Sequence, residues 1–364
     1  MVRCDLCGSS ESAVLFIGQN PRIPNGERFF RVVECCGCGL IFLSPMPEGS
    51  ELAAYYPQDY YDDLGRVGAH ATRRSSSLRR LRKSIRRALL ERYYQYPAAT
   101  GGPRAKASSN GLLRLMNAAC LQVERGRLHV SGREAAIIPF VGEGRLLDVG
   151  CGSGKELEPF KELGWDVTGV EMSPYSASKA RARLGCEVLV GDFEEIPLDD
   201  ERFDVVRFSH SLEHVQSPRK ALEKAFRVLR PSGLLWIEVP NAASLERRLF
   251  GALWFCWDLP RHLYHFTPET LSRLLTHTGF RPVKIKCDSR VLFFVESLAN
   301  VLAHWLGIRP RRTKLLSTLV RPLTYALGAM NRGSILSVHA RKDPAWRAVP
   351  SGARDDRRSD GSAG

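Results

Sequence analysis

Four cysteines near the N-terminus have the spacing of a metal site. Cys4 and Cys7 form one C-x2-C pair, Cys35 and Cys38 form a second, and a glycine follows each pair. Two such turns can present four thiolates tetrahedrally, and the glycines let backbone N–H groups point at sulfur. Because the protein fills all four positions, the spacing predicts a structural zinc ion and not a catalytic one. A redox-active dithiol and a metal-free cluster are the alternatives.

A glycine-rich turn in the middle of the chain is the second candidate site. Gly150, Gly152 and Gly154 follow the apolar run Leu146–Val149 and precede a helical segment. Such a strand-to-helix turn lets a ligand approach the backbone at the carboxyl end of a parallel sheet. The spacing is G-x-G-x-G, so the third glycine of a dinucleotide fingerprint is missing. An ordinary turn without a ligand is the alternative.

Acidic residues follow the next two predicted strands. Glu171 ends the second strand, where a carboxylate can accept both hydroxyls of a ribose. Asp192 and Phe193 follow the third strand and combine a carboxylate with an aromatic ring, which suits an adenine amine and its ring face. Three signals at successive strand ends together predict a nucleoside site.

These residues resemble the class I S-adenosylmethionine-dependent methyltransferases, over roughly residues 143–342. The resemblance implies that the glycine-rich turn contacts the methionine moiety, Glu171 the ribose and Asp192 the adenine. It also implies that the segment after the fourth strand, residues 208–215, faces the sulfonium. The implied cofactor-binding residues are Asp148, Gly150, Cys151, Gly152, Gly154, Glu171, Met172, Asp192, Phe193 and Ser209.

The pattern from Arg145 onward predicts an α/β fold, because short apolar runs alternate with amphipathic helices. The predicted strands are 145–149, 166–170, 187–190, 204–208, 234–239, 281–286 and 335–340, and the predicted helices are 155–163, 174–183, 218–229 and 268–278. The resemblance implies a Rossmann-like sheet of seven strands in which 335–340, the last strand, runs antiparallel. A small N-terminal zinc ribbon and helical insertions complete the predicted architecture.

Five side chains are candidates for catalysis. A hydroxyl acceptor needs a general base, and histidine is the usual one near neutral pH. His210, Glu213 and His214 follow the fourth strand, and His262 and His265 follow the fifth, where the acceptor pocket is expected. Each histidine could instead be a structural hydrogen-bonding residue.

The N-terminal cysteines, with Pro45-Met46-Pro47 and the tyrosine pairs that follow, narrow the resemblance to bacterial methyltransferases of sugars, polysaccharides and secondary metabolites. The sugar C-methyltransferases of that group carry a Glu-His pair where this chain has Arg261-His262. Arginine cannot abstract a proton, so the difference favours O-methylation. Arg261 is predicted to hold a phosphate or carboxylate of the acceptor. The expected acceptor is a small molecule, a sugar or a lipid-linked molecule.

Two segments carry the positive charge of the chain, which totals +14. Residues 66–92 contain ten basic residues and one acid, and residues 297–342 contain eight basic residues and no acid, which leaves 14 − 9 − 8 = −3 for the rest. The first segment has apolar residues at helical spacing, which predicts a basic amphipathic helix. These residues are Leu78, Leu81, Ile85, Leu89 and Tyr93. Both segments could bind an anionic membrane surface peripherally, or be a solvated helix and a lid. RNA binding is a weaker alternative, and nucleic acid is not expected as a partner.

The chain is expected in the cytoplasm, either free or at the inner face of the membrane. It has no apparent secretion signal or long apolar span, and its ten cysteines suit a reducing compartment. The expected domains are a zinc-ribbon module (1–62), a basic helical linker (63–140), a methyltransferase core (141–342) with a helical insertion (291–334), and a disordered tail (343–364).

Overall fold

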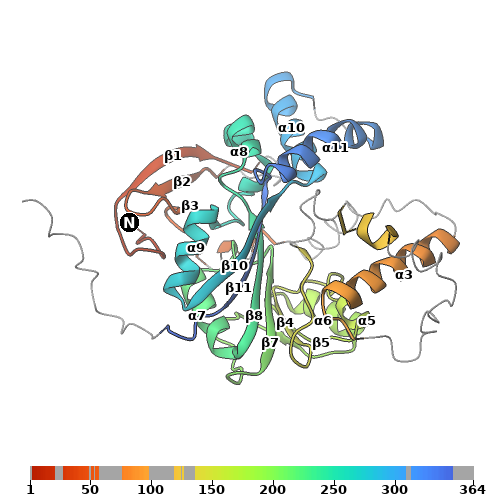
Figure 1. Ribbon diagram of the computed structural model, residues 1–364. Helices are drawn as coiled ribbons and strands as arrows, with labels where there is room; N and C mark the ends of the chain where they lie inside the picture. The colour runs from red at the N-terminus through yellow and green to blue at the C-terminus, as the bar shows by residue number, and fades with distance from the viewer. Residues whose placement is uncertain are drawn as a thin grey trace, which may run out of the picture.

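The computed structural model describes residues 2–20, 28–48, 51–52, 54–56, 76–97, 119–123, 125–126, 136–308 and 313–346. A seven-stranded sheet forms its centre (Figure 1). Its strands are β4 (Arg145–Val149), β5 (Asp166–Glu171), β6 (Val188–Val190), β7 (Phe203–Ser209), β8 (Leu229–Pro240), β10 (Phe280–Asp288) and β11 (Ile335–Lys342). They lie in the order β10-β11-β8-β7-β4-β5-β6, with β11 antiparallel to both of its neighbours and the β8-β7-β4-β5-β6 neighbours parallel. This confirms the predicted fold and the antiparallel last strand.

The central strands are mostly apolar because helices cover both faces of the sheet, and the buried charges of Asp148 on β4 and Arg207 on β7 pair with each other. Leu146 and Val205 belong to one buried cluster, whereas their chain neighbours Leu147 and Val206 belong to the other. The helices are α5 (Glu158–Glu162), α6 (Pro174–Leu184), α7 (Pro218–Val228), α8 (Leu245–Phe250), α9 (Pro268–His277), α10 (Val291–Leu306) and α11 (Lys314–Ala329), with short 3-10 turns at Gly251–Leu253 and Phe255–Trp257. Each element predicted from residue 145 onward is present, with shifted ends.

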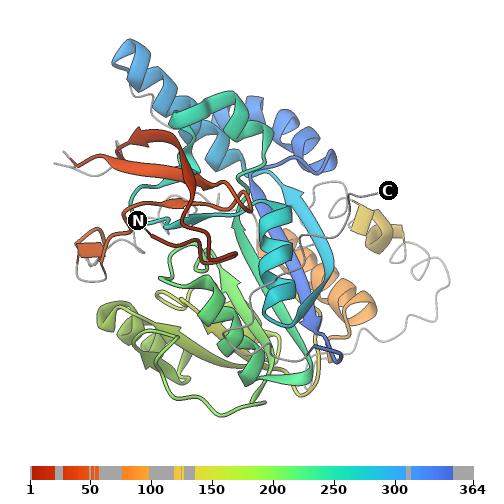
Figure 2. The ribbon, with the colours of Figure 1, turned by 90° about the vertical axis from the view of Figure 1, so that its left-hand side faces the viewer.

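A second, four-stranded sheet connects the N-terminal region to the methyltransferase-like core. Its strands are β1 (Ser12–Gly18), β2 (Phe30–Cys35), β3 (Ile41–Leu43) and β9 (Tyr264–His265), in that order. The first three come from the N-terminal region, but β9 comes from the segment after β8 and pairs with β3 through Ile41↔His265. The N-terminal unit is therefore built onto the α/β core, as Figure 2 shows. No pattern in the sequence predicts this pairing, because β3 and β9 are far apart in the chain.

The basic helix α3 (Ser76–Tyr93) packs against the core through part of its apolar side. Leu89 and Leu90 are almost fully buried, and Ile85 is half-buried. The apolar side of the described C-terminal half of α3 is thus occupied by the protein itself, which argues against membrane binding through these residues. Leu78 and Leu81 have side chains outside the described part of the chain, as does the tail from residue 347. Among the described helices, none has the length and apolar character needed to cross a bilayer.

Candidate active site

The glycine-rich turn connects β4 to the segment before α5 and has a left-handed backbone. Gly150 and Gly154 have φ angles of 78° and 74°. A Cβ atom on Gly150 would lie 2.7 Å from the Cβ of Ser211, and one on Gly154 would lie 2.8 Å from a methyl carbon of Leu184. Both the backbone conformation and the close packing therefore require glycine at these two positions.

Glu171 lies at the carboxyl end of β5, directly against this turn. One carboxylate oxygen accepts a hydrogen bond from the backbone N–H of Gly152 at 2.8 Å, and the other accepts one from the N–H of Ser173 at 2.9 Å. Burial raises the pKa of Glu171, and these backbone donors oppose that rise. The carboxylate thus faces the glycine-rich turn, where the sequence placed it, and ribose binding by Glu171 stays a prediction. Met172, the next residue, is exposed.

Two residues of the predicted loop turn their side chains inward. The Asp148 carboxylate is 2% exposed, and both of its oxygens accept hydrogen bonds from one guanidinium nitrogen of Arg207 at 2.8 Å. Cys151 is also buried, and its sulfur would lie 2.6 Å from a Cβ on Gly169. The loop that contains Asp148 and Cys151 was predicted to contact the methionine moiety. The side chains of these two residues instead pack inside the protein, so only their backbone atoms stay candidates for that contact.

The predicted adenine site is only partly retained. Asp192 is half-buried after β6, where one of its carboxylate oxygens accepts a hydrogen bond from the N–H of Glu194 at 2.9 Å. Phe193 is 3% exposed and packs edge-to-face on Phe208 in the core. A ring buried in this way has no free face, so the predicted stacking of Phe193 on adenine is wrong for this structure. Ser209 is half-buried at the end of β7.

His210 lies between two buried carboxylates. Its ring nitrogens are 3.5 Å from a Glu213 oxygen and 3.4 Å from a Glu238 oxygen, while Arg290 binds Glu238 at 2.9 and 3.0 Å. Burial opposes a charge on the imidazole, but the hydrogen bonds and charges of Glu213 and Glu238 outweigh burial and raise the pKa of His210 to about 9. A protonated ring cannot accept a proton, so we revise the predicted role of His210 as a general base near neutral pH.

The raised pKa of His210 predicts a pH-dependent stability. Its pKa is about 9 when folded and about 6.5 when unfolded, so the stabilisation is complete below pH 6.5 and is lost as the pH rises through 9. Between pH 6.5 and pH 9, we expect the free energy of unfolding to fall less with rising pH in His210→Asn than in the wild type. Urea unfolding at several pH values measures this difference. Asparagine tolerates the left-handed backbone of this residue, whose φ is 52°. Equal losses in both proteins would contradict the assignment.

Glu213, His214 and His262 converge on one buried point. Their candidate ligand atoms all lie within 4.8 Å of one another. The Nδ1 atom of His214 is 2.8 Å from the carbonyl oxygen of Arg261, and that of His262 is 2.8 Å from the carbonyl oxygen of Cys256. Because a carbonyl only accepts, Nδ1 of each ring donates to it, and in the neutral form of either ring Nε2 keeps a lone pair.

The charges of this cluster are uneven. Burial favours the neutral acid of Glu213, but His210, His214 and His262 lower the pKa of its fully buried carboxyl. Burial and the neighbouring His214 lower the pKa of His262 to about 4, so this ring is neutral at pH 7. The structure thus brings together three of the five residues predicted to be catalytic, with one carboxylate beside two imidazole rings.

His265 and Arg261 are both buried inside the protein. His265 is 1% exposed, its ring centre lies 4.6 Å from that of Trp257, and burial lowers its pKa well below the ordinary value. Arg261 is buried and donates to Asp258 at 2.6 Å. The predicted catalytic role of His265 and the predicted anion-binding role of Arg261 are therefore wrong, since internal packing holds both side chains.

The N-terminal unit reaches this cluster through Tyr56. Its hydroxyl lies 2.9 Å from Nδ1 of His214, at the ring nitrogen that also meets Arg261. Asp5 accepts hydrogen bonds from the Ser217 hydroxyl at 2.9 Å and the Arg219 N–H at 2.8 Å, at the start of α7. Sequence reasoning noted the tyrosine pairs but gave Tyr56 no role, because only the folded chain brings it to His214.

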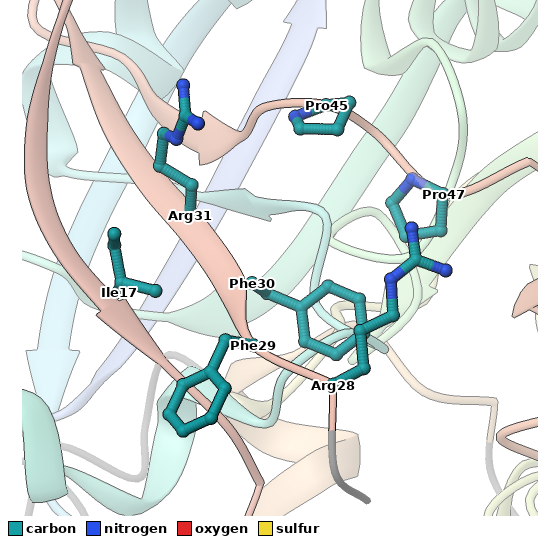
Figure 3. Close-up of a pocket in the computed structure, with 7 residues that line it drawn as sticks. All are labelled: Ile17, Arg28, Phe29, Phe30, Arg31, Pro45 and Pro47. Atoms are coloured by element: carbon teal, nitrogen blue, oxygen red, sulfur yellow. The ribbon is translucent and has the colours of Figure 1, made fainter.

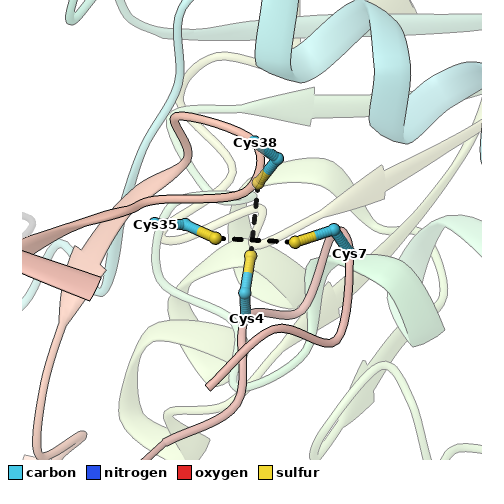
Figure 4. Close-up of side chains that lie close together, drawn as sticks. All are labelled: Cys4, Cys7, Cys35 and Cys38. Atoms are coloured by element: carbon cyan, nitrogen blue, oxygen red, sulfur yellow. Dashed lines mark hydrogen bonds between the residues drawn. The ribbon is translucent and has the colours of Figure 1, made fainter. Parts of the chain in front are cut away.

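The four N-terminal sulfur atoms form a compact group (Figure 4). The Cys4 and Cys38 sulfurs are 3.4 Å apart, the Cys7 and Cys35 sulfurs are 3.5 Å apart, and all four lie within 4.8 Å of one another. These distances exceed the S–S bond length of about 2.05 Å. A tetrahedral zinc ion with Zn–S bonds of about 2.3 Å separates its sulfurs by roughly 3.8 Å. The donor set and its spacing therefore fit such an ion.

A pocket on the N-terminal unit lies beside the strands β1 and β2 (Figure 3). Its lining consists of Ile17, Arg28, Phe29, Phe30, Arg31, Pro45 and Pro47. It contains two arginines and two aromatic rings but no residue from the glycine-rich turn or the histidine cluster, so we assign it no part in the chemistry.

Comparison with known families agrees with this geometry. Residues 112–285 match the family described as methyltransferase domain, and this range contains the glycine-rich turn, Glu171 and the histidine cluster. The core of this chain is therefore similar to methyltransferase domains, and its sheet has the antiparallel strand that the resemblance to the class I enzymes implies. The matched range thus contains all the residues that were predicted to bind the cofactor or to act in catalysis, from Asp148 to His265.

Curated relatives that are similar to this part of the chain include O-methyltransferases. The ubiquinone biosynthesis O-methyltransferase of Cereibacter sphaeroides is 34% identical over 163 residues, which are 42% of this chain and 66% of that protein. The malonyl-[acyl-carrier protein] O-methyltransferase of Serratia marcescens is 33% identical over 130 residues, 35% of this chain and 50% of that protein. The chain thus spans just under two thirds of the first relative and half of the second.

Solved structures also align with the methyltransferase domain. One is a SAM-dependent methyltransferase from Archaeoglobus fulgidus, with 26% identity, a TM-score of 0.41, and coverage of 61% of this chain and 94% of that chain.

Proposed function

We propose that this protein transfers a methyl group from S-adenosylmethionine to an oxygen atom of a small-molecule, sugar or lipid-linked acceptor. The observation that carries the proposal is the cluster of Glu213, His214 and His262, which follows the same sheet edge as the glycine-rich turn. The named activities of the curated relatives, both O-methyltransferases, support this type of acceptor atom.

His214 is our candidate for the general base. It is half-buried, and its Nδ1–H donates to the Arg261 carbonyl, which orients the Nε2 lone pair away from that carbonyl. S-adenosylmethionine, when bound, supplies an electrophilic methyl group on a sulfonium. His214 accepts the proton of the acceptor hydroxyl as its oxygen forms the new C–O bond, and the C–S electron pair stays on sulfur. The negative charge of Glu213 stabilises the resulting imidazolium.

We expect His214→Asn to lower turnover by about 10²- to 10⁴-fold because it removes the proton acceptor. Asparagine can still donate to the Arg261 carbonyl, so the fold and the affinity for S-adenosylhomocysteine should be unchanged. Turnover is measured by mass spectrometry with isotopically labelled methyl donor and panels of phenols, sugars and carboxylates as acceptors.

His277→Asn is the matched control, because His277 is an exposed histidine at the end of α9. It should keep wild-type turnover. A His214→Asn variant that turns over as fast as this control would contradict the base assignment. Absence of methyl transfer to any oxygen acceptor by the wild type, with transfer to carbon or nitrogen instead, would contradict O-methylation.

We also propose that Cys4, Cys7, Cys35 and Cys38 hold a structural zinc ion. Bound there, zinc stabilises the N-terminal turns and through them the pairing of β3 with β9, which precedes the methyltransferase helix α9. The hydrogen bonds of Asp5 to the start of α7 favour this structural role over RNA binding, because this face of the N-terminal unit is occupied by the core.

A further inference from the structure

The helices α10 and α11 are in contact with each other and form a hairpin. The hairpin lies at one end of the molecule (Figures 1 and 2). Several large apolar side chains of this hairpin are exposed to solvent: Trp305 74%, Leu306 62%, Ile308 60%, Leu315 70%, Leu319 67% and Leu323 46%. Exposed apolar side chains in such a group indicate an interaction surface.

The exposed leucines of α11 form one row. Leu315, Leu319 and Leu323 are four residues apart, so they follow one another along one side of the helix. Val320 and Leu327 are buried, so another side of the same helix packs on the protein. The row is therefore not part of the core, and it begins ten residues after Trp305 in the chain.

The charge of the same region identifies the chemistry of its partner. Residues 309–332, between the end of α10 and the start of β11, contain six lysines and arginines and no acid. Arg321 of α11 is exposed. An anionic bilayer offers an apolar interior and a negative surface, and so matches both properties. A second copy of this chain would bring the same positive charges to the contact and be repelled.

We propose that the end of α10 and the outer row of α11 dock on the surface of an anionic membrane. The 16-residue helix α10 is about 24 Å long, and its first residues lie at the candidate active site. There Arg290 binds Glu238, and the Phe293 ring lies 6.0 Å from that of His210. One rigid helix thus connects the docking surface to the site, although docking itself does not depend on the reaction catalysed.

Co-flotation with vesicles tests the proposal on the full chain. We expect recovery with vesicles in which phosphatidylglycerol replaces about a third of the phosphatidylcholine, and little recovery with phosphatidylcholine alone. The double variant Leu315→Ser/Leu319→Ser should partition at least about tenfold more weakly. The control Val14→Ser/Ile17→Ser changes two similarly exposed side chains on β1 and should bind as the wild type does. Circular dichroism checks that both variants are folded.

Tryptophan fluorescence gives a second readout. The structure describes all six tryptophans, and Trp305 is the exposed one among them. Lipids brominated on the acyl chains should quench its emission, and Trp305→Phe should remove that quenching. Three results would overturn the proposal: equal recovery with neutral and anionic vesicles, equal weakening by the control pair, or a lipid-free dimer that the α11 leucine variant abolishes. The last result would assign the surface to a second copy of the chain.

Discussion

Cys7→Ser is expected to remove bound zinc from this protein and to lower its methyl transfer about 10²-fold or more, while S-adenosylhomocysteine still binds. Zinc binding contributes about 10–16 kcal/mol in small zinc domains, so loss of one ligand should unfold the turns around Cys4 and Cys35. The pairing of β3 with β9 and the contact of Tyr56 with His214 depend on that unit. Small misplacements of a catalytic group cost roughly 10²-fold in rate.

The measurement has three parts: zinc content per chain, thermal unfolding and turnover. Cys36→Ser is the matched control, since Cys36 is an equally exposed thiol next to Cys35 that lies outside the four-sulfur group. It should keep one zinc per chain and wild-type turnover. Identical zinc content in the Cys7→Ser and Cys36→Ser variants would disprove the metal site. A zinc-free variant with full turnover would disprove the link to the histidine cluster.

Asp148→Asn is expected to lower the free energy of unfolding by about 3–5 kcal/mol, because it leaves the Arg207 guanidinium buried without a counter-charge. The two side chains are 2% and 5% exposed, and Arg207 stands between the rings of Phe160 and Trp236 at 5.5 and 5.3 Å. Burial raises the pKa of Asp148, and the positive charge of Arg207 offsets this rise only in part. Burying the pair therefore costs free energy, and removing one partner costs more. Urea unfolding measures the loss.

Two comparisons make this prediction specific. The double variant Asp148→Asn/Arg207→Met should recover part of the lost stability, since the unpaired charge is gone. Glu187→Gln breaks the exposed pair of Arg202 and Glu187, at 2.6 Å, and should cost less than about 1 kcal/mol. If Asp148→Asn is as stable as Glu187→Gln but no longer binds S-adenosylhomocysteine, Asp148 is a ligand of the cofactor after all.

The sequence by itself determined the α/β core of this protein. Strands buried on both faces are mostly apolar, and several helices begin after residues such as Ser217 and Thr267, whose side chains accept from a backbone N–H of the first turn. Both patterns are local and can be recognised in the sequence. The same holds for the glycine-rich turn, for Glu171 at its strand end and for the two cysteine pairs, whose spacing alone predicts four converging sulfurs.

Only the tertiary structure decided which candidate side chains face a ligand. Asp148, Phe193, Arg261 and His265 have residue types suited to binding or catalysis, yet each is buried against a partner or the core. Tyr56 has no motif of its own and lies beside His214 because β3 pairs with β9 across more than two hundred residues of chain. The direction of a side chain and the charge of its neighbours depend on contacts between distant segments, and these contacts set its pKa and its role.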